Sequence, residues 1–571
     1  MSFSEIESKL NKLKADSEAP EWMEVQSYDK LRKGYLSENE TPRNMYRRIA
    51  NSAAKHLLMP ELEDKFFDLM WDNILCPATP ILSNSGTNRG LPISCYGVDV
   101  NDSVWDISGK VQEVSMLSKH GGGVGVGFSR IRPRGTKIQN GENGVSDGIV
   151  GFMKMYDSTI NAMSQGSTRR GAGSINLDIE HGDWAEFIRM RRPEGDVNRQ
   201  CGNLHHCTFI KDKWMESMLA GDFDKRQSWV ELMKARMELG ESYIAFYDNI
   251  NKTNPDAYKT NNLDISMTNI CTEITLHTDE NHSFICCLSS LNLMKWEEFK
   301  ARDAVKLSTY FLNGILNEFI FKARGLAGLH RVVRSAEKGR AIGLGVLGWH
   351  SLLQTKMMPF GSFETMQLNN EIFRHLKLEA VAASKELAEK FGEPTWLKGS
   401  EMYNTHLLAV APTRSNCTIS CVDSFGIEPL YSNYYIDSGS KGEYAVKNRL
   451  LEELLKSKNK NTKEVWKSIR QNKGSVQQLT FLNDQEKSVF KTAYEIDQQV
   501  IIQQAAQRQR WICQAQSLNL FFPKGVDPKY FSDTHILAWQ LGVKTLYYCR
   551  SEAGIVVDEA NRNEECVACE G

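Results

Sequence analysis

Short apolar runs separated by glycine-rich turns alternate with long amphipathic segments over most of this chain, and this alternation restricts its fold more than any other feature. From Pro77 to about Thr208 the apolar runs are brief and glycines are frequent, as in HGGGVGVGFSRIRPRG. Helical periodicity instead marks segments such as DKWMESMLAGDFDKRQSWVELMKARMELG and LNNEIFRHLKLEAVAASKELAEKFG. Mixed strand and helix signals on this scale predict an α/β architecture.

Charge and hydropathy exclude several classes of partner. The 571 residues are 41% hydrophobic, so the chain can bury a large core, and its 71 acidic and 69 basic residues nearly cancel. This balance gives no global attraction to nucleic acid or to a membrane surface. The N-terminus lacks an apolar signal region, and no run of about 18 apolar residues occurs. We therefore expect a cytoplasmic protein with no nucleic-acid partner and no membrane partner.

The periodicity also suggests regions of different character. Residues 1–70 show helical periodicity, and residues 440–505 form a polar, lysine-rich helical region that we expect to be an outer layer without chemistry. Residues 550–571 are acidic and lack core-forming periodicity, which predicts a flexible C-terminal tail.

The segment NICTE, residues 269–273, places an amide, a thiol and a carboxylate at two-residue intervals. If the segment is extended, Asn269, Cys271 and Glu273 leave the same face and their side chains meet in one small volume. The alternative is a strand end with one polar face and a buried cysteine that only packs. These residues alone leave both interpretations open.

Thirteen cysteines in a chain without a secretion signal do not indicate a disulfide framework. Cys566 and Cys569 form a C-x-x-C pair close to the C-terminus, and the nearest other cysteine is the isolated Cys549. Because zinc normally needs four ligands, we favour an exchangeable dithiol over half of a zinc site, and we predict no metal.

Two loops have residue types that suit an anion. Gly121 to Gly127 lacks the Gly-Lys-Ser/Thr ending of a P-loop, but with the arginines of RIRPR it could hold a phosphate. A tight turn with solvated arginines explains that stretch equally well. The second loop, APTRSNCTIS at 411–420, could open a helix with N–H groups and hydroxyls facing an anion. Two such loops indicate nucleotides, as substrate or as effector.

Taken in order along the chain, several motifs closely resemble the catalytic large subunit of ribonucleotide reductase, of the oxygen-dependent class I type. They are ATP and ISC within residues 78–95, the glycine loop with RIR, NICTE, ICCLSSLNL, GIEP at 426–429, KTLYY at 544–548 and the terminal cysteine pair. The resemblance runs from about residue 30 to the C-terminus. It implies a ten-stranded α/β barrel with a helical N-terminal region (1–70), a catalytic barrel with effector-binding loops (71–549) and a mobile redox tail (550–571).

The resemblance implies reduction of ribonucleoside diphosphates by three groups of NICTE. Cys271, as a thiyl radical, would take the hydrogen at C3′ of the substrate. Glu273 would accept the 3′-hydroxyl proton as general base, and Asn269 would hydrogen-bond the sugar.

The same resemblance assigns the remaining redox cysteines. Cys95 and Cys286 would donate electrons and end as a disulfide, with Cys287 as an alternative one residue away. Cys566 and Cys569 would then reduce that disulfide and be regenerated by thioredoxin or glutaredoxin.

Tyr547 and Tyr548 alone indicate an aromatic strand. The resemblance instead implies a relay that carries an electron and a proton from a radical-generating small (beta) subunit, whose metal cofactor supplies the radical. No cofactor is expected to be bound covalently to this chain. The tyrosine pair separates the chain from the adenosylcobalamin-dependent class, and Asn269 with Glu273 argues against the glycyl-radical class.

Nucleotide contacts are also implied by the resemblance. The predicted substrate-binding residues are Thr79, Ser94, Pro412, Thr413, Arg414, Ser415 and Asn416. Arg414 and Asn416 depart from the commonest class I pattern, and one extra residue precedes GIEP. Asp102 and Arg132 would bind a nucleoside triphosphate effector (dNTP or ATP) at a homodimer interface, and residues 191–203 would transmit effector identity.

Few residues precede the region of resemblance, so we expect no N-terminal ATP-cone. The alternatives are an adenosylcobalamin-dependent reductase, a non-catalytic nucleotide-binding paralogue and a simple thiol-disulfide oxidoreductase. Five matching redox cysteines argue against the paralogue, and the anion loops with the tyrosine pair argue against the oxidoreductase.

Overall fold

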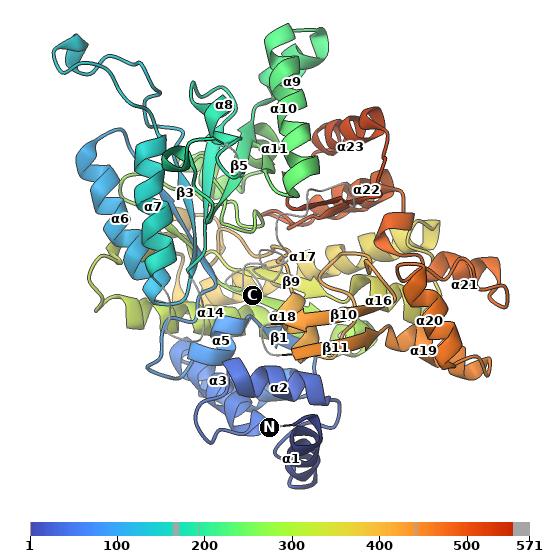
Figure 1. Ribbon diagram of the computed structural model, residues 1–571. Helices are drawn as coiled ribbons and strands as arrows, with labels where there is room; N and C mark the ends of the chain where they lie inside the picture. Colours follow the sequence, from blue (N-terminus) through green and yellow to red (C-terminus); the bar gives the residue numbers. More distant parts are fainter. Residues whose placement is uncertain (1, 164–170, 193–194, 440–441, 552–571) are drawn as a thin grey trace.

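A computed structural model describes residues 2–163, 171–192, 195–439 and 442–551 of the protein (Figure 1). The described residues up to Trp71 are mostly helical, and Ser2 and Glu5 form a capping box at the start of the first helix. Asn317 of α14 (Ala304–Ala323) donates to the carbonyl oxygen of His56, which ties this N-terminal layer to the rest of the chain. The four helices are α1 (Phe3–Ala15), α2 (Val25–Gly34), α3 (Pro42–Leu57) and α4 (Glu63–Trp71).

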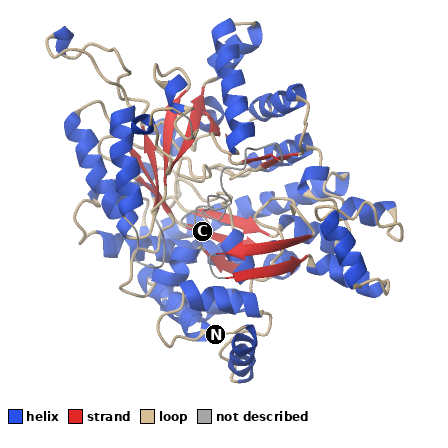
Figure 2. Cartoon of the chain, in the orientation of Figure 1, coloured by secondary structure: helices blue, strands red, loops and turns tan. Residues whose placement is uncertain are grey.

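The larger sheet has seven strands in the order β13-β6-β5-β4-β3-β2-β7 (Figure 2). Strands β2 to β6 run parallel, whereas β7 and β13 are antiparallel to their neighbours at the two edges. The strands are β2 (Cys95–Asp99), β3 (Gly123–Gly127), β4 (Gly173–Asp178), β5 (Leu204–Ile210), β6 (Tyr243–Phe246), β7 (Phe284–Cys286) and β13 (Thr545–Leu546).

The smaller sheet is connected to the larger one by a chain segment in which a single residue separates the two strands. Cys287 separates β7 from β8 (Leu288–Asn292), so one segment passes from the first sheet into the second. Strand β8 pairs with β1 (Leu75–Pro77) and with β9 (Gly343–Leu347). Parallel bridges at Leu344 with Leu408 and at Val410 with Gln516 extend this side. The predicted mixed α/β barrel fold is thereby confirmed, with the larger sheet curled as a half-barrel.

Helices cover the outside of these sheets, and α6 lies against α7 beside β3 (Figure 1). None of the described helices is long and apolar enough to cross a membrane. Together with α14, the longer helices are α6 (Val104–Lys119), α7 (Val150–Ala162), α9 (Asp212–Ala220), α10 (Phe223–Leu239), α15 (His330–Gly339), α17 (Phe363–Phe391), α22 (Gln498–Gln509) and α23 (Pro528–Gln540). The shorter ones are α5 (Thr79–Asn84), α8 (Trp184–Phe187), α11 (Tyr247–Lys252), α12 (Asp256–Thr260), α13 (Trp296–Lys300), α16 (Trp349–Thr355) and α18 (Arg414–Ile419).

The lysine-rich region contains α19 (Arg449–Ser457), α20 (Lys463–Gln471) and α21 (Asp484–Val489), which follow the hairpin β10 (Tyr434–Gly439) and β11 (Gly442–Lys447). Its helices bury a small apolar cluster of their own, which includes Leu451, Trp466 and Val489. The main core is a separate and much larger cluster. This region is therefore an outer layer with a local core of its own.

Candidate active site

The NICTE segment forms a tight turn and is not extended. The amide N–H of Thr272 donates to the carbonyl oxygen of Asn269 at 3.1 Å, and Thr272 has a left-handed φ of 66°. The side-chain oxygen of Asn269 accepts from the N–H of Ile274 at 3.0 Å. Asn269, Cys271 and Glu273 are each only 1% exposed. The turn, rather than strand alternation, buries the three side chains together.

The larger sheet supports this turn from one side through a glycine. A β-carbon at Gly125 of β3 would lie 2.3 Å from the backbone oxygen of Thr268, so only glycine allows this close approach. Asn176 of β4 also fixes Thr268, because its side-chain oxygen accepts from the Thr268 N–H at 3.1 Å. Since β3 is a central strand whose backbone pairs with β2 and β4, the glycine run is not a phosphate-binding loop.

Ser517, which no sequence motif marks, supports the turn from a segment far along the chain. Its hydroxyl lies 2.7 Å from the carbonyl oxygen of Cys271 and 3.2 Å from a carboxylate oxygen of Glu273. The N–H of Ala515 donates to the carbonyl oxygen of Glu273 at 2.9 Å. A serine in a polar QAQSLNL stretch carries no sequence signal for this role, because it acts through a bridge between distant segments.

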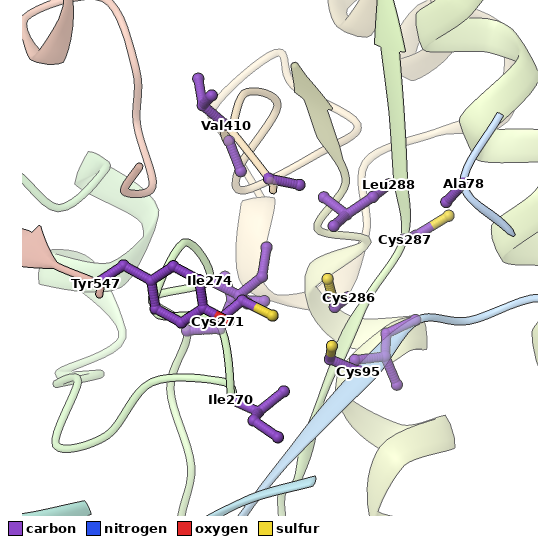
Figure 3. Close-up of a cluster of buried hydrophobic side chains, with 14 of the residues drawn as sticks. Ala78, Cys95, Ile270, Cys271, Ile274, Cys286, Cys287, Leu288, Val410 and Tyr547 are labelled. Atoms are coloured by element: carbon purple, nitrogen blue, oxygen red, sulfur yellow. The ribbon is translucent and has the colours of Figure 1, made fainter. Parts of the chain in front are cut away.

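Cys95 and Cys286 face each other across β2 and β7. Their Cα atoms are direct partners in the antiparallel register, which places opposed side chains at the separation that a disulfide requires. The thiol of Cys286 also lies 4.0 Å from a carboxylate oxygen of Glu273. In Figure 3 the sulfur of Cys271 points toward those of Cys95 and Cys286. The structure thus brings together three of the predicted redox thiols and Glu273.

The environment of Cys286 keeps its thiol protonated. Burial raises the pKa of Cys286 well above its ordinary value, and the hydrogen bond with Cys95 and the nearby Glu273 carboxylate raise it further. A protonated thiol can donate a proton or a hydrogen atom. Cys286 is therefore suited to deliver hydrogen to a ligand in this space and not to act as a resident thiolate.

Cys287 lies on the other face of the strand. Its sulfur points away from the other thiols, toward Ala78 in Figure 3, and donates to the carbonyl oxygen of Leu312 in α14 at 3.5 Å. Burial raises the pKa of the Cys287 thiol as well. Of the two adjacent cysteines, only Cys286 lies with Cys95.

Asn269 carries a polar group suited to a ligand. Its side-chain nitrogen is buried and has no hydrogen-bond partner among the described residues, although its oxygen is satisfied by Ile274. Buried amide donors nearly always have an acceptor. A hydroxyl group of a ligand beside Cys271 would supply one.

Tyr547 and Tyr548 lie between β13 and β14 (Cys549–Ser551), which pairs with β12 (Leu520–Phe522). Their ring centroids are 4.3 Å apart, and Figure 3 shows Tyr547 beside Cys271. Tyr547 is buried, whereas Tyr548 is half-buried. The pair therefore spans from the partly exposed surface to the buried thiol.

A third tyrosine, which no sequence motif marks, completes this aromatic cluster. The ring of Tyr243 in β6 lies 4.6 Å from Tyr547 and 5.2 Å from Tyr548. Arg236 of α10 is fully buried and donates to the carbonyl oxygen of Tyr547 at 3.1 Å. Neither residue lies near KTLYY in the sequence, so only the fold reveals the cluster.

The predicted substrate loop adjoins the start of the smaller sheet. Asn416 of α18 donates to the carbonyl oxygen of Pro77 at 2.9 Å, two residues before Thr79 at the start of α5. The hydroxyl of Thr413 accepts from the N–H of Gly426 at 2.7 Å, which joins this loop to GIEP. The structure thus brings the 412–416 loop to Thr79.

Ser94 is buried directly before Cys95, next to the thiol pair. Its N–H donates to the carbonyl oxygen of Cys286 at 3.4 Å, and its own carbonyl accepts from Gly123 at 3.1 Å. The structure therefore places Ser94 beside the thiols, directly before the strand that begins at Cys95.

Glu428 of GIEP is held by Asn519, which donates to its carboxylate at 2.7 Å. Burial raises the pKa of Glu428 to about 7, although Arg550 and Arg414 oppose this shift. Arg550 also lies over the Tyr548 ring, 4.9 Å from its centroid. A carboxyl group that titrates near neutral pH therefore lies close to the aromatic cluster.

The predicted effector residues meet outside the thiol site. Arg132 donates to the carboxylate of Asp102 at 2.6 Å, and each side chain is about one-third exposed. Cys566 and Cys569 lie outside the described residues, as do positions 193 and 194 of the 191–203 segment.

Comparisons with known proteins agree with this arrangement. The ribonucleotide reductase barrel domain matches residues 93–225, 220–403 and 396–549, and the all-alpha domain of ribonucleotide reductase matches residues 22–90. A Frog virus 3 protein named as a ribonucleoside-diphosphate reductase large subunit is 38% identical over 536 residues, covering 90% of this chain and 93% of the relative. The ribonucleoside-diphosphate reductase large subunit of Invertebrate iridescent virus 3 is 31% identical over 625 residues, covering 95% and 97%. The solved class Id ribonucleotide reductase alpha subunit of Actinobacillus ureae superposes with a TM-score of 0.87 at 41% identity, covering 94% of this chain and 98% of that one.

Proposed function

The chain belongs to the ribonucleotide reductase large-subunit family, and we propose that it reduces ribonucleoside diphosphates to 2′-deoxyribonucleoside diphosphates by thiyl-radical chemistry. The family is one of oxidoreductases of deoxyribonucleotide synthesis. One observation carries the chemical proposal: the facing thiols Cys95 and Cys286, the carboxylate of Glu273 and the turn at Cys271 share one buried site.

In the proposed reaction the Cys271 thiyl radical takes the hydrogen atom at C3′ of the substrate, and Glu273 accepts the 3′-hydroxyl proton. The unpartnered amide nitrogen of Asn269 holds the sugar in position. The 2′-hydroxyl leaves as water with one hydrogen from the thiol pair, and C2′ receives the other. Cys95 and Cys286 lose two electrons and form a disulfide. Glu273 returns its proton to the 3′-oxygen, and Cys271 returns its hydrogen atom to C3′.

Electrons and the radical come from outside the described residues. Cys566 and Cys569 would reduce the Cys95–Cys286 disulfide and then exchange with thioredoxin or glutaredoxin. A small (beta) subunit with a metal cofactor would supply the radical through Tyr548 and Tyr547, whose graded burial supports a path inward.

We also propose a cytoplasmic homodimer that binds nucleoside triphosphate effectors. Trp105 and Val104 at the start of α6 are 90% and 72% exposed, and Met155 of the adjacent α7 is 42% exposed. Exposed apolar side chains on two packed helices suit a self-association face. The Arg132 and Asp102 pair, close to the start of α6, would bind the effector there.

The test is formation of deoxycytidine diphosphate from cytidine diphosphate with a dithiol reductant and an effector. Reactions receive either the cognate small subunit or adenosylcobalamin, and Cys271→Ser is the blank. Turnover that requires the small subunit supports the proposal. Turnover with adenosylcobalamin alone would keep the thiol site but overturn the relay and the partner, and no turnover in either arm would overturn the catalytic proposal.

A further inference from the structure

A buried cluster of His277, Asp279 and His282 lies in the connection between the NICTE turn and β7, and no step of the proposed reaction uses it. Its three candidate ligand atoms all lie within 4.8 Å of one another. His277 and His282 are 6% and 9% exposed, whereas the Asp279 side chain is one-third exposed and opens the cluster to solvent.

The hydrogen-bond pattern at His277 leaves two acceptors facing each other. Its Nδ1 lies 2.7 Å from the carbonyl oxygen of Asp264, which can only accept, so Nδ1 carries a hydrogen. In the neutral ring Nε2 then has a lone pair, and it faces a carboxylate oxygen of Asp279 at 3.1 Å. Such a contact is favourable only with a cation between the two atoms, either a proton or a metal ion.

The geometry around Asp279 suits a metal ion. Nδ1 of His282 lies 2.9 and 3.0 Å from the two carboxylate oxygens of Asp279. A tetrahedral ion with bonds of about 2.0–2.2 Å to two histidines and a carboxylate needs ligand atoms about 3.3–3.6 Å apart. These hydrogen-bonded atoms would therefore move apart by a few tenths of an ångström to admit it, which leaves one position for water. A carbonyl behind His277 is the outer contact that orients metal-binding histidines. Trp396 packs against the ring of His282, with centroids 5.2 Å apart.

We propose that His277, Asp279 and His282 form a binding site for a divalent transition metal ion of the Zn²⁺ type, with Lys338 as its competitor. The ammonium group of Lys338 lies 3.0 Å from Nε2 of His282 and can only donate, so His282 now directs its Nδ1 hydrogen at Asp279. To bind metal through Nδ1, His282 must shift that hydrogen to Nε2, and Lys338 must turn away. Bound metal would clamp the loop that joins Glu273 to Cys286. The site does not depend on the proposed reaction.

Cobalt binding to the full chain tests this site. The chain carries Cys566→Ser and Cys569→Ser, so that the terminal dithiol cannot contribute, and Co²⁺ is titrated under reducing conditions with Zn²⁺ as displacer. We expect one equivalent of Co²⁺ with nitrogen and oxygen ligation, lacking a thiolate charge-transfer band. His277→Gln should weaken binding more than about tenfold, whereas His330→Gln, at an exposed histidine of α15, should leave it unchanged.

The direction in which Lys338→Met changes Co²⁺ affinity is the decisive result, because this substitution removes the competing cation and leaves all three ligands in place. We expect it to tighten Co²⁺ binding about tenfold or more, which loss of a merely structural contact would not do. Two results would overturn the proposal: no saturable binding by the chain that retains Lys338, or binding with a thiolate band that His277→Gln leaves unchanged. In either case the three side chains form a hydrogen-bonded cluster that binds no metal.

Discussion

Cys95 and Cys286 are direct Cα partners at the antiparallel junction of β2 and β7, while Cys287, the next residue, hydrogen-bonds to α14 on the other face of the strand. Strand alternation separates two adjacent cysteines that sequence alone could not distinguish. The pairing therefore decides which thiol can form a disulfide with Cys95.

The two adjacent cysteines should respond differently to substitution. Cys286→Ser should abolish multiple-turnover formation of deoxycytidine diphosphate, because Cys95 loses its disulfide partner. Cys287→Ser should keep turnover and lower the free energy of unfolding by about 1–3 kcal/mol, since a hydroxyl replaces a buried thiol. Product assays and urea unfolding measure both effects. Equal loss of turnover in the two variants would contradict the assignment.

Gly125→Ala should damage catalysis more than folding. The added methyl group would meet the backbone oxygen of Thr268 at 2.3 Å and displace the NICTE turn. We expect turnover to fall about 10²-fold, as a 1 Å misplacement can cause. The matched control is Gly325→Ala, just after α14, where no residue beyond its two chain neighbours lies within 4 Å of the added carbon. Wild-type turnover in Gly125→Ala would show that the turn does not need this contact.

Tyr243 should act by packing and not by its hydroxyl. Tyr243→Phe keeps the ring that contacts Tyr547 and Tyr548, so most turnover should remain. Tyr243→Ala should lower the free energy of unfolding by about 3–5 kcal/mol and disorder the pair. Turnover with the small subunit and thermal unfolding measure these effects. If Tyr243→Phe lost activity as completely as Tyr547→Phe, Tyr243 would itself belong to the relay.

Trp105→Glu should separate the proposed homodimer. A charge on this 90% exposed indole position would be buried in the dimer and should weaken association at least about 30-fold, as loss of an interface hot spot does. Analytical ultracentrifugation with a nucleoside triphosphate effector provides the measurement. Val230→Glu, at a 59% exposed position of α10, is the control for added surface charge. An unchanged dimer in Trp105→Glu would place the interface elsewhere.

Glu428 should make stability depend on pH. Its pKa is raised from an ordinary value of 4.5 to about 7, so the folded state binds this proton more tightly than the unfolded state. Its contribution to stability is fully present below pH 4.5 and is lost as the pH rises to about 7. Urea unfolding at pH 5 and pH 8 should show a smaller difference for Glu428→Gln than for the parent chain. An identical difference in both proteins would rule out this carboxyl group as the source.

The sequence by itself determined the fold class and the family. Alternating apolar runs and helical segments predicted the α/β architecture, and ordered motifs from ATP to KTLYY predicted the ribonucleotide reductase family. These signals are available from the sequence because each motif consists of a few consecutive residues. The motifs also predicted Cys271, Glu273 and the pair of Cys95 and Cys286 as catalytic residues, and the fold brings these four side chains together.

Only the tertiary structure decided the contacts between distant segments. The NICTE segment, whose spacing would align three side chains if it were extended, is a turn, and Gly125 and Ser517 both lie against it. The glycine run that suggested a phosphate loop is the central strand β3. Tyr243 joins the aromatic cluster, and Lys338 reaches His282, across more than fifty residues of sequence. Periodicity and motifs indicate which face of a helix or strand is buried, but not which other element packs against that face. These contacts depend on how the sheets pack together, so only the tertiary structure reveals them.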